Sequence, residues 1–180
     1  MPANTRTMTG MPSAHQITLL QGGQMLFPAL AQAIDAAQHE VRLETYIFNF
    51  DASGELIAAA LARAAERGVQ VFLTVDGVGT PQLPLPWMRR FNESGVQWHV
   101  FQPLGRWGAL IPSRWRRLHR KLCIVDGEIG FCGGINIMDD FHDPAVGTLL
   151  EPRLDFAVRV MGPLVHDMQE TAAECVECRC

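Results

Sequence analysis

The residue types best suited to chemistry in this sequence lie within one stretch of 18 positions. In chain order they are His119, Lys121, Asp126, Gly133, Gly134 and Asn136. In an extended segment, side chains two positions apart point to the same face, so His119 and Lys121 are predicted to lie together. A neutral imidazole can act as nucleophile or general acid/base, and an ammonium group can bind a phosphate oxygen. The pair therefore suits attack on a phosphodiester without a metal ion.

The residues that follow the pair add donors for an anion. Gly133 and Gly134 allow backbone amides to approach an anion closely, and the Asn136 amide can donate to a phosphoryl oxygen. A lone His-x-Lys is more often an ordinary strand histidine beside a solvated lysine. The combined spacing is much more specific, and it predicts a phosphoryl-transfer site with His119, Lys121 and Asp126 as catalytic candidates.

The elements that must position this site alternate between strand and helix patterns. Helices are predicted at 23–37, 54–67 and 87–94 and from 162 onward, and strands at 41–48, 69–75, 96–101, 118–125, 128–132 and 154–160. Asp51 or Ser53 is predicted to cap the second helix, and Gly68 to end it. Asp126-Gly127 predicts a tight hairpin. The pattern predicts an α/β fold, one mixed β-sheet flanked by helices.

Charge and composition limit the partners. The chain has 180 residues, and its net charge of -4 gives no general affinity for nucleic acid, so no nucleic-acid partner is expected. Basic residues nevertheless cluster locally, at Arg106, Arg114, Arg116, Arg117, Arg120 and Lys121. The basic, tryptophan-bearing loop 103–117 suits an anionic headgroup at a membrane interface, although a merely solvated loop is the alternative.

Three regions are predicted along the chain. Residues 1–14 form a disordered polar start, 15–168 a single domain, and 169–180 an atypical cysteine-rich tail. No signal peptide or membrane-spanning apolar run is evident, which predicts a cytoplasmic protein, peripheral at the inner membrane. The tail cysteines, Cys175, Cys178 and Cys180, form a C-x-x-C without a second ligand pair, so neither a metal nor a cofactor is expected. Cys123 and Cys132 are predicted to be buried small hydrophobes.

The spacing His119-x-Lys121-x(4)-Asp126-x(6)-Gly133-Gly134-x-Asn136 resembles the motif of the phospholipase D superfamily, with every position matched. The resemblance covers residues 16–165 and is closest to bacterial cardiolipin synthases of the short type without N-terminal membrane helices. The further segments that carry it are Glu44-Thr-Tyr46-Ile-Phe48, Arg67-Gly68-Val69, Asp76-Gly77-Val-Gly79, Arg153-Leu-Asp155 and Gly162-Pro163.

This resemblance implies a mechanism and residue roles. The family histidine forms a phosphohistidine, and a second motif histidine protonates the leaving alcohol and activates the incoming one. Carried over, His119 is nucleophile or acid/base, and Lys121 and Asn136 bind the phosphoryl group. Asp126 then braces the hairpin. Asp155 is the candidate that orients a catalytic histidine, with a solvated strand carboxylate as the alternative.

Glu44 is predicted to lie on a strand beside the motif strand. There it could line the pocket, or it could be a buried structural carboxylate paired with an arginine. The sequence does not decide between these two roles.

The chain departs from the family in having one His-x-Lys, whereas family sites combine two. The second comes from another lobe of the same chain or from a homodimer partner. The tail loses the expected apolar stripe, which suggests truncation or a frameshift.

Three functions stay open. The first is a phosphatidyltransferase of phospholipid biosynthesis, acting on anionic phosphatidylglycerol-like lipid at a membrane. The second is a homodimeric, metal-independent phosphodiesterase or nuclease. The third is a catalytically inactive half that lacks its partner lobe.

Overall fold

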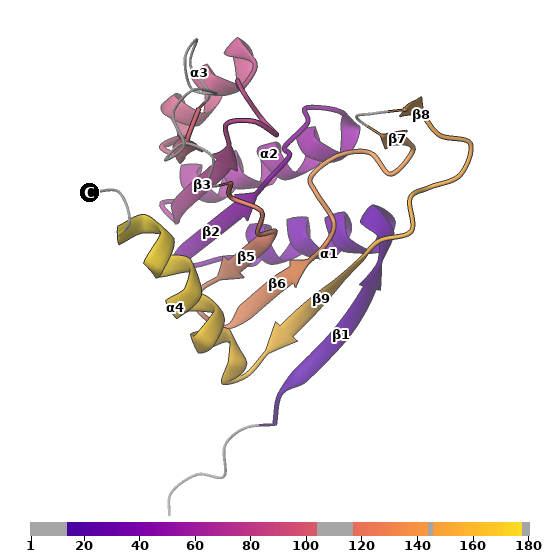
Figure 1. The fold of residues 1–180 in the computed structure, drawn as a ribbon. Helices are drawn as coiled ribbons and strands as arrows, with labels where there is room; N and C mark the ends of the chain where they lie inside the picture. Colours follow the sequence, from indigo (N-terminus) through magenta and orange to yellow (C-terminus); the bar gives the residue numbers. More distant parts are fainter. Residues whose placement is uncertain (1–13, 104–116, 144–145, 178–180) are drawn as a thin grey trace, which may run out of the picture.

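A seven-stranded mixed sheet forms the centre of the fold (Figure 1). The computed structural model describes residues 14–103, 117–143 and 146–177, with side chains to 172. The helices are α1 (Gly22–Ala36), α2 (Ala52–Glu66), α3 (Leu85–Ser94) and α4 (Leu164–Glu177). The sheet strands are β1 (Gln16–Gln21), β2 (Glu40–Thr45), β3 (Gln70–Asp76), β4 (Gln97–Phe101), β5 (Leu122–Val125), β6 (Ile129–Gly133) and β9 (Phe156–Met161). The small strands β7 (His142–Asp143) and β8 (Gly147–Thr148) pair outside the sheet.

The strand order is β1-β9-β6-β5-β2-β3-β4. Strands β2, β3 and β4 are parallel and are linked through α2 and α3, whereas the other pairings are antiparallel. Helices α1 and α2 lie on one face of the sheet and α4 on the other (Figure 1). The predicted α/β fold with helices flanking one mixed sheet is confirmed.

The core explains why these segments became helices and strands. The main cluster lies between the sheet and the α1–α2 layer, where the inward residues Leu30, Ile34, Ile57 and Leu61 are at most 2% exposed. A smaller cluster under α4 contains Ile124 and residues from β9 and α4. Within the described segments, none of the helices combines the length and apolarity that crossing a bilayer requires.

Local signals set the ends of α2 as predicted. The Asp51 side chain accepts a hydrogen bond from the Gly54 amide at 3.0 Å and caps the helix. Gly68 follows the helix with φ of +92°, a conformation that glycine adopts without strain. The Asp126-Gly127 hairpin is also confirmed, because both residues have positive φ between β5 and β6.

Two sequence expectations need correction. The motif is predicted on strand 118–125, but β5 begins only at Leu122, opposite Glu44 of β2. Strand β1 is not predicted from the sequence; it is an edge strand whose Ile17 and Leu19 are 60% exposed, so it lacks a buried-face pattern.

Two predicted regions are only partly described. Helix α4 runs across the predicted boundary at 168 to Glu177, and the tail residues Cys178 and Cys180 lie outside the described residues. The predicted disordered start lies outside them except for Ala14.

Candidate functional site

The predicted motif residues other than Asp126 lie where β5 begins and β6 ends, at one end of the central strands. The chain enters β5 directly after Lys121, leaves β6 at Gly133, and enters β9 directly after Asp155. Because β5 and β6 are antiparallel, as are β6 and β9, the start of β5, the end of β6 and the start of β9 lie at the same end of these strands. Helix α1 also begins there, since the Gly22 amide donates to the Asp155 carbonyl oxygen at 2.9 Å.

His119 is exposed at this end of the strands and packs against an aromatic ring. The imidazole and the Tyr46 ring have centroids 4.8 Å apart, with their planes tilted by 35°. The Lys121 ammonium lies 5.6 Å from the same Tyr46 ring centroid and donates to the His119 carbonyl oxygen at 3.2 Å. His119 and Lys121 therefore share one face, as the spacing predicts, and Tyr46 lies between them. The place of Tyr46 in the site is not predictable from the sequence, because a tyrosine at the end of a strand has no chemical signature of its own.

Lys121 is half-buried, and two features of its environment shift its pKa in opposite directions. Loss of solvent lowers the pKa of its ammonium below the ordinary value, while the nearby Asp155 carboxylate raises it and partly compensates. An ammonium with few water contacts is a stronger electrostatic partner for a phosphoryl oxygen than a fully solvated one.

Asp155 lies beside Lys121 and the second motif glycine. Its Oδ1 accepts from the Phe156 amide at 2.7 Å, and a Cβ placed on Gly134 would collide with this carboxylate. Within the described residues, no hydrogen bond or ion pair joins Asp155 to His119. Asp155 instead acts electrostatically on Lys121, and its orienting role stays a prediction.

Gly133 and Gly134 serve close packing. The Gly133 amide donates to the Lys121 carbonyl oxygen at 3.3 Å, and the Gly134 amide donates to the Phe156 carbonyl oxygen at 2.9 Å. A Cβ on Gly133 would overlap the backbone of β9. Both amides are engaged in hydrogen bonds between strands, and the contact of these glycines with an anion stays a prediction.

Asn136 is held through its side-chain oxygen, and among the described residues its amide nitrogen has no hydrogen-bond acceptor. Its Oδ1 accepts from the Ile47 amide at 3.1 Å, and Ile137 exchanges backbone hydrogen bonds with Ile47 and Asn49. An amide whose oxygen is fixed in this way presents NH₂ as the remaining polar group. This orientation agrees with the predicted role of Asn136 as a phosphoryl ligand.

Glu44 forms the ion pair that the sequence analysis left as an alternative. The Glu44 Oε2 and Arg120 Nη2 atoms are 2.8 Å apart, and the Glu44 side chain is only 7% exposed. Arg120 also donates to the Thr171 carbonyl oxygen of α4. The middle residue of the motif thus ties β2 to α4, and Glu44 is the partner of that arginine.

Asp126 lies at the opposite end of β5 from Lys121. Its carboxylate accepts the backbone amides of Gln38, His39 and Glu40 at 2.8–2.9 Å. Burial alone would raise the pKa of Asp126, but these hydrogen bonds and the nearby His39 outweigh burial and lower it. The contacts favour the bracing role over the catalytic one.

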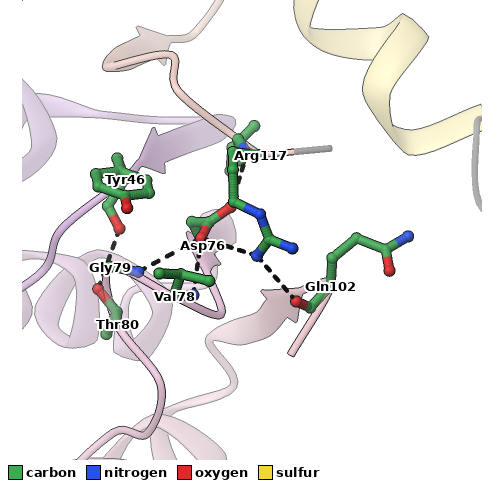
Figure 2. A network of polar contacts seen from close by, with 8 residues as sticks. Tyr46, Asp76, Val78, Gly79, Thr80, Gln102 and Arg117 are labelled. Carbon is green, nitrogen blue, oxygen red and sulfur yellow. Dashed lines mark hydrogen bonds and ion pairs between the residues drawn. The ribbon is translucent and has the colours of Figure 1, made fainter. Parts of the chain in front are cut away.

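A second polar group, which sequence reasoning missed, holds the start of the motif segment. Figure 2 shows Asp76 at the end of β3 with Arg117, Gln102, Val78 and Gly79 around it. An aspartate that directly follows a run of apolar strand residues and precedes a glycine was the available signal.

An open cavity of about 310 Å³ borders the motif on the side of α4. It is lined by His119, Arg120, Lys121, Leu122, Cys132, Gly133, Met168 and Thr171. Cys132 is half-buried at this wall, whereas Cys123 is fully buried, as predicted.

Some predicted features fall outside the description. Arg106, Arg114 and Arg116 belong to the segment 104–116, which is not described, so the basic tryptophan-bearing loop is untested. Within the described residues, no group of three or more His, Cys, Asp or Glu side chains is placed to hold a metal ion.

Comparisons with known proteins agree with the motif. The family model described as "Cardiolipin synthase, PLD-like domain" matches residues 30–143. Cardiolipin synthase B of Salmonella typhi is 36% identical over 169 residues, which cover 92% of this chain and 39% of that protein. Cardiolipin synthase B of Escherichia coli K12 is 35% identical over 160 residues, which cover 89% of this chain and 38% of that protein. The chain thus spans about two fifths of the length of these curated relatives.

Solved structures share the fold at low identity. Nuc, a phospholipase D family member from Salmonella typhimurium, aligns with a TM-score of 0.65 at 20% identity, covering 89% of this chain and 93% of that one. NucT from Helicobacter pylori aligns with a TM-score of 0.67 at 14% identity, and the alignment covers 91% of this chain and 97% of NucT.

Proposed function

This chain belongs to the family of cardiolipin synthase, phospholipase D-like domains, and on that premise we propose that it is one lobe of a phosphatidyltransferase. The proposed reaction moves a phosphatidyl group from one phosphatidylglycerol-like lipid to the hydroxyl of another. The proposal depends mainly on one observation. His119, Lys121 and Asn136 all contact the short segment 46–47, and the His119 imidazole is exposed.

The proposed chemistry runs in two displacement steps at phosphorus. A nitrogen of His119 bonds to phosphorus while the bond from phosphorus to the leaving glycerol oxygen breaks, and a second histidine gives that oxygen its proton. The acceptor hydroxyl then loses its proton to the second histidine and displaces His119. Lys121 and the Asn136 amide bind the phosphoryl oxygens, whose negative charge grows as the bonds rearrange.

The second histidine must come from outside this lobe. The relatives named above are more than twice as long as this chain, which is consistent with a second lobe. We propose that a second lobe or a second copy of this chain supplies the missing group. Asp155, which touches no motif histidine of its own lobe, would face that incoming histidine. Binding to anionic lipid at a membrane surface belongs to the same proposal.

The direct test incubates the purified chain with phosphatidylglycerol vesicles in the presence of a metal chelator. Cardiolipin and free glycerol are expected in equal amounts, and His119→Ala is expected to abolish both. An Asp35→Asn variant, changed on the far helical layer, is the matched control and should retain the activity. Absence of product from the chain alone and from a mixture with a second lobe would reject the proposal.

One observation favours a second candidate, a homodimeric phosphodiesterase. The chain covers 93% and 97% of two solved chains of this fold, so a single lobe can be nearly a whole chain. Sedimentation equilibrium separates the candidates, because a monomer cannot combine two motifs. A dimer that cleaves bis(p-nitrophenyl) phosphate or DNA but makes no cardiolipin would favour the second candidate.

A further inference from the structure

The buried carboxylate of Asp76 lies next to the residue that precedes His119. Asp76 is 0% exposed and ends β3, two strands away from β5 in the sheet. Its Oδ2 accepts the Leu118 backbone amide at 2.8 Å. The contact spans 42 positions of sequence and holds the chain one peptide unit before the imidazole-bearing residue.

The other oxygen of Asp76 is also used. Oδ1 accepts the amide of Val78 at 2.8 Å and that of Gly79 at 3.4 Å, and the Arg117 Nη1 lies 3.5 Å away. Arg117 in turn donates to the Gln102 carbonyl oxygen at 3.3 Å. Asp76 therefore joins its own loop, 77–80, to both residues that enter the motif segment, Arg117 and Leu118.

The same loop holds the aromatic partner of His119. The Thr80 hydroxyl accepts the Phe48 amide at 2.7 Å. It also donates to the Tyr46 carbonyl oxygen at 3.4 Å (Figure 2). A Cβ on Gly79 would collide with that carbonyl oxygen, so the loop passes directly along Tyr46. One loop thus fixes the backbone on both sides of the contact between Tyr46 and His119.

We infer that Asp76 is a positioning residue for His119: its carboxylate holds Leu118 while its loop holds Tyr46, and together they set the direction of the imidazole. The motif segment 118–121 needs such support because it precedes β5 and has no partner strand on the β2 side. The inference rests on the proposed function in one respect, since it takes His119 as the reacting group.

The test compares Asp76→Ala and Asp76→Asn in the full chain by NMR. Amide hydrogen exchange at Leu118 is expected to speed up about tenfold or more in Asp76→Ala, because a hydrogen bond to a charged acceptor is lost. The cross-relaxation between the Tyr46 and His119 rings is expected to weaken. Asparagine can satisfy either Leu118 or the loop amides, but not both, so Asp76→Asn should show a smaller change.

The matched control is Asp51→Asn. Asp51 also accepts one backbone amide on each oxygen, that of the nearby Gly54 and that of the distant Asp139, and none of its hydrogen bonds involves Leu118 or Tyr46. The Asp51→Asn variant should leave the amide exchange rate of Leu118 and the contact between the Tyr46 and His119 rings unchanged.

Turnover of phosphatidylglycerol vesicles supplies the functional readout. A kcat about 100-fold lower in Asp76→Ala with little change in KM is expected from a misplaced imidazole. Leu118 protection and ring contact that persist in folded Asp76→Ala would overturn the inference, as would failure of both variants to fold. A wild-type chain that shows no turnover, either by itself or mixed with a second lobe, would reject the proposed function and leave the positioning inference standing, because the NMR comparison does not depend on activity.

Discussion

The imidazole of His119 lies against the ring of Tyr46, 4.8 Å between centroids, although 73 positions separate the two residues. Replacing Tyr46 by leucine should remove this support while leaving the backbone contacts of Tyr46 with Thr80. Because an aromatic pair contributes about 0.5–1.5 kcal/mol, kcat should fall roughly 2- to 10-fold. Tyr46→Phe keeps the ring and is the control. Equal rates for the leucine and phenylalanine variants, measured with phosphatidylglycerol vesicles, would contradict a positioning role for the ring.

The charge of Lys121 should respond to Asp155. Burial lowers the pKa of Lys121 and Asp155 raises it, so Asp155→Asn should lower that pKa further from its ordinary value of 10.5. The titration can be followed by NMR of the lysine Cε and Nζ signals. Glu128→Gln, at the far hairpin, should leave the titration unchanged. A Lys121 pKa that rises in Asp155→Asn would show that the carboxylate does not act on this ammonium.

Asp126 should make stability depend on pH in the acidic range. Its folded-state pKa is lowered below the ordinary 3.8, so its contribution is fully present above that value and is lost as the pH falls through the folded-state pKa. Asp126→Asn should therefore cost about 1–2 kcal/mol of unfolding free energy at neutral pH, from the lost charge-assisted hydrogen bonds. Asparagine tolerates the positive φ of 53° at this position.

The measurement is urea unfolding of wild type and Asp126→Asn between pH 7 and pH 2. The difference in unfolding free energy should shrink below the ordinary pKa. A difference that stays constant over this range would contradict the assignment. Turnover should be little affected if Asp126 only braces the hairpin.

The ion pair of Glu44 and Arg120 should show coupled energetics. Breaking a fully buried pair costs about 3–5 kcal/mol, but the Arg120 side chain is 31% exposed, so about 1–3 kcal/mol is expected for Glu44→Gln or Arg120→Met. The double variant should cost less than the sum, because neither charge is then left alone. Thermal unfolding of the three variants gives the coupling. Strict additivity would mean that the pair contributes nothing beyond its separate side chains.

The reactive groups of the candidate site could be predicted from the local spacing of residues. His119 and Lys121 are two positions apart, and an extended backbone places them on one face even though β5 begins only at Leu122. Helix α2 and the Asp126-Gly127 turn were also predictable, because a capping aspartate and positive-φ residues act over a few positions.

Contacts between segments far apart in the sequence could not be predicted from local spacing. Strand β1 was missed because its pairing with β9 spans most of the chain and leaves one face exposed. The roles of Tyr46 and Asp76 depend on where the ends of β2 and β3 meet the start of the motif segment.

The sequence by itself therefore determined which groups can react: an imidazole, an ammonium and an amide at fixed separations along an extended chain. Only the tertiary structure decided what holds them. It assigned Gly133 and Gly134 to close packing, Glu44 to Arg120, and Asp76 to the backbone before His119. The physical reason is that spacing along a strand acts through local geometry, whereas a hydrogen bond or a packed ring requires two segments whose meeting is set by the order of strands in the sheet.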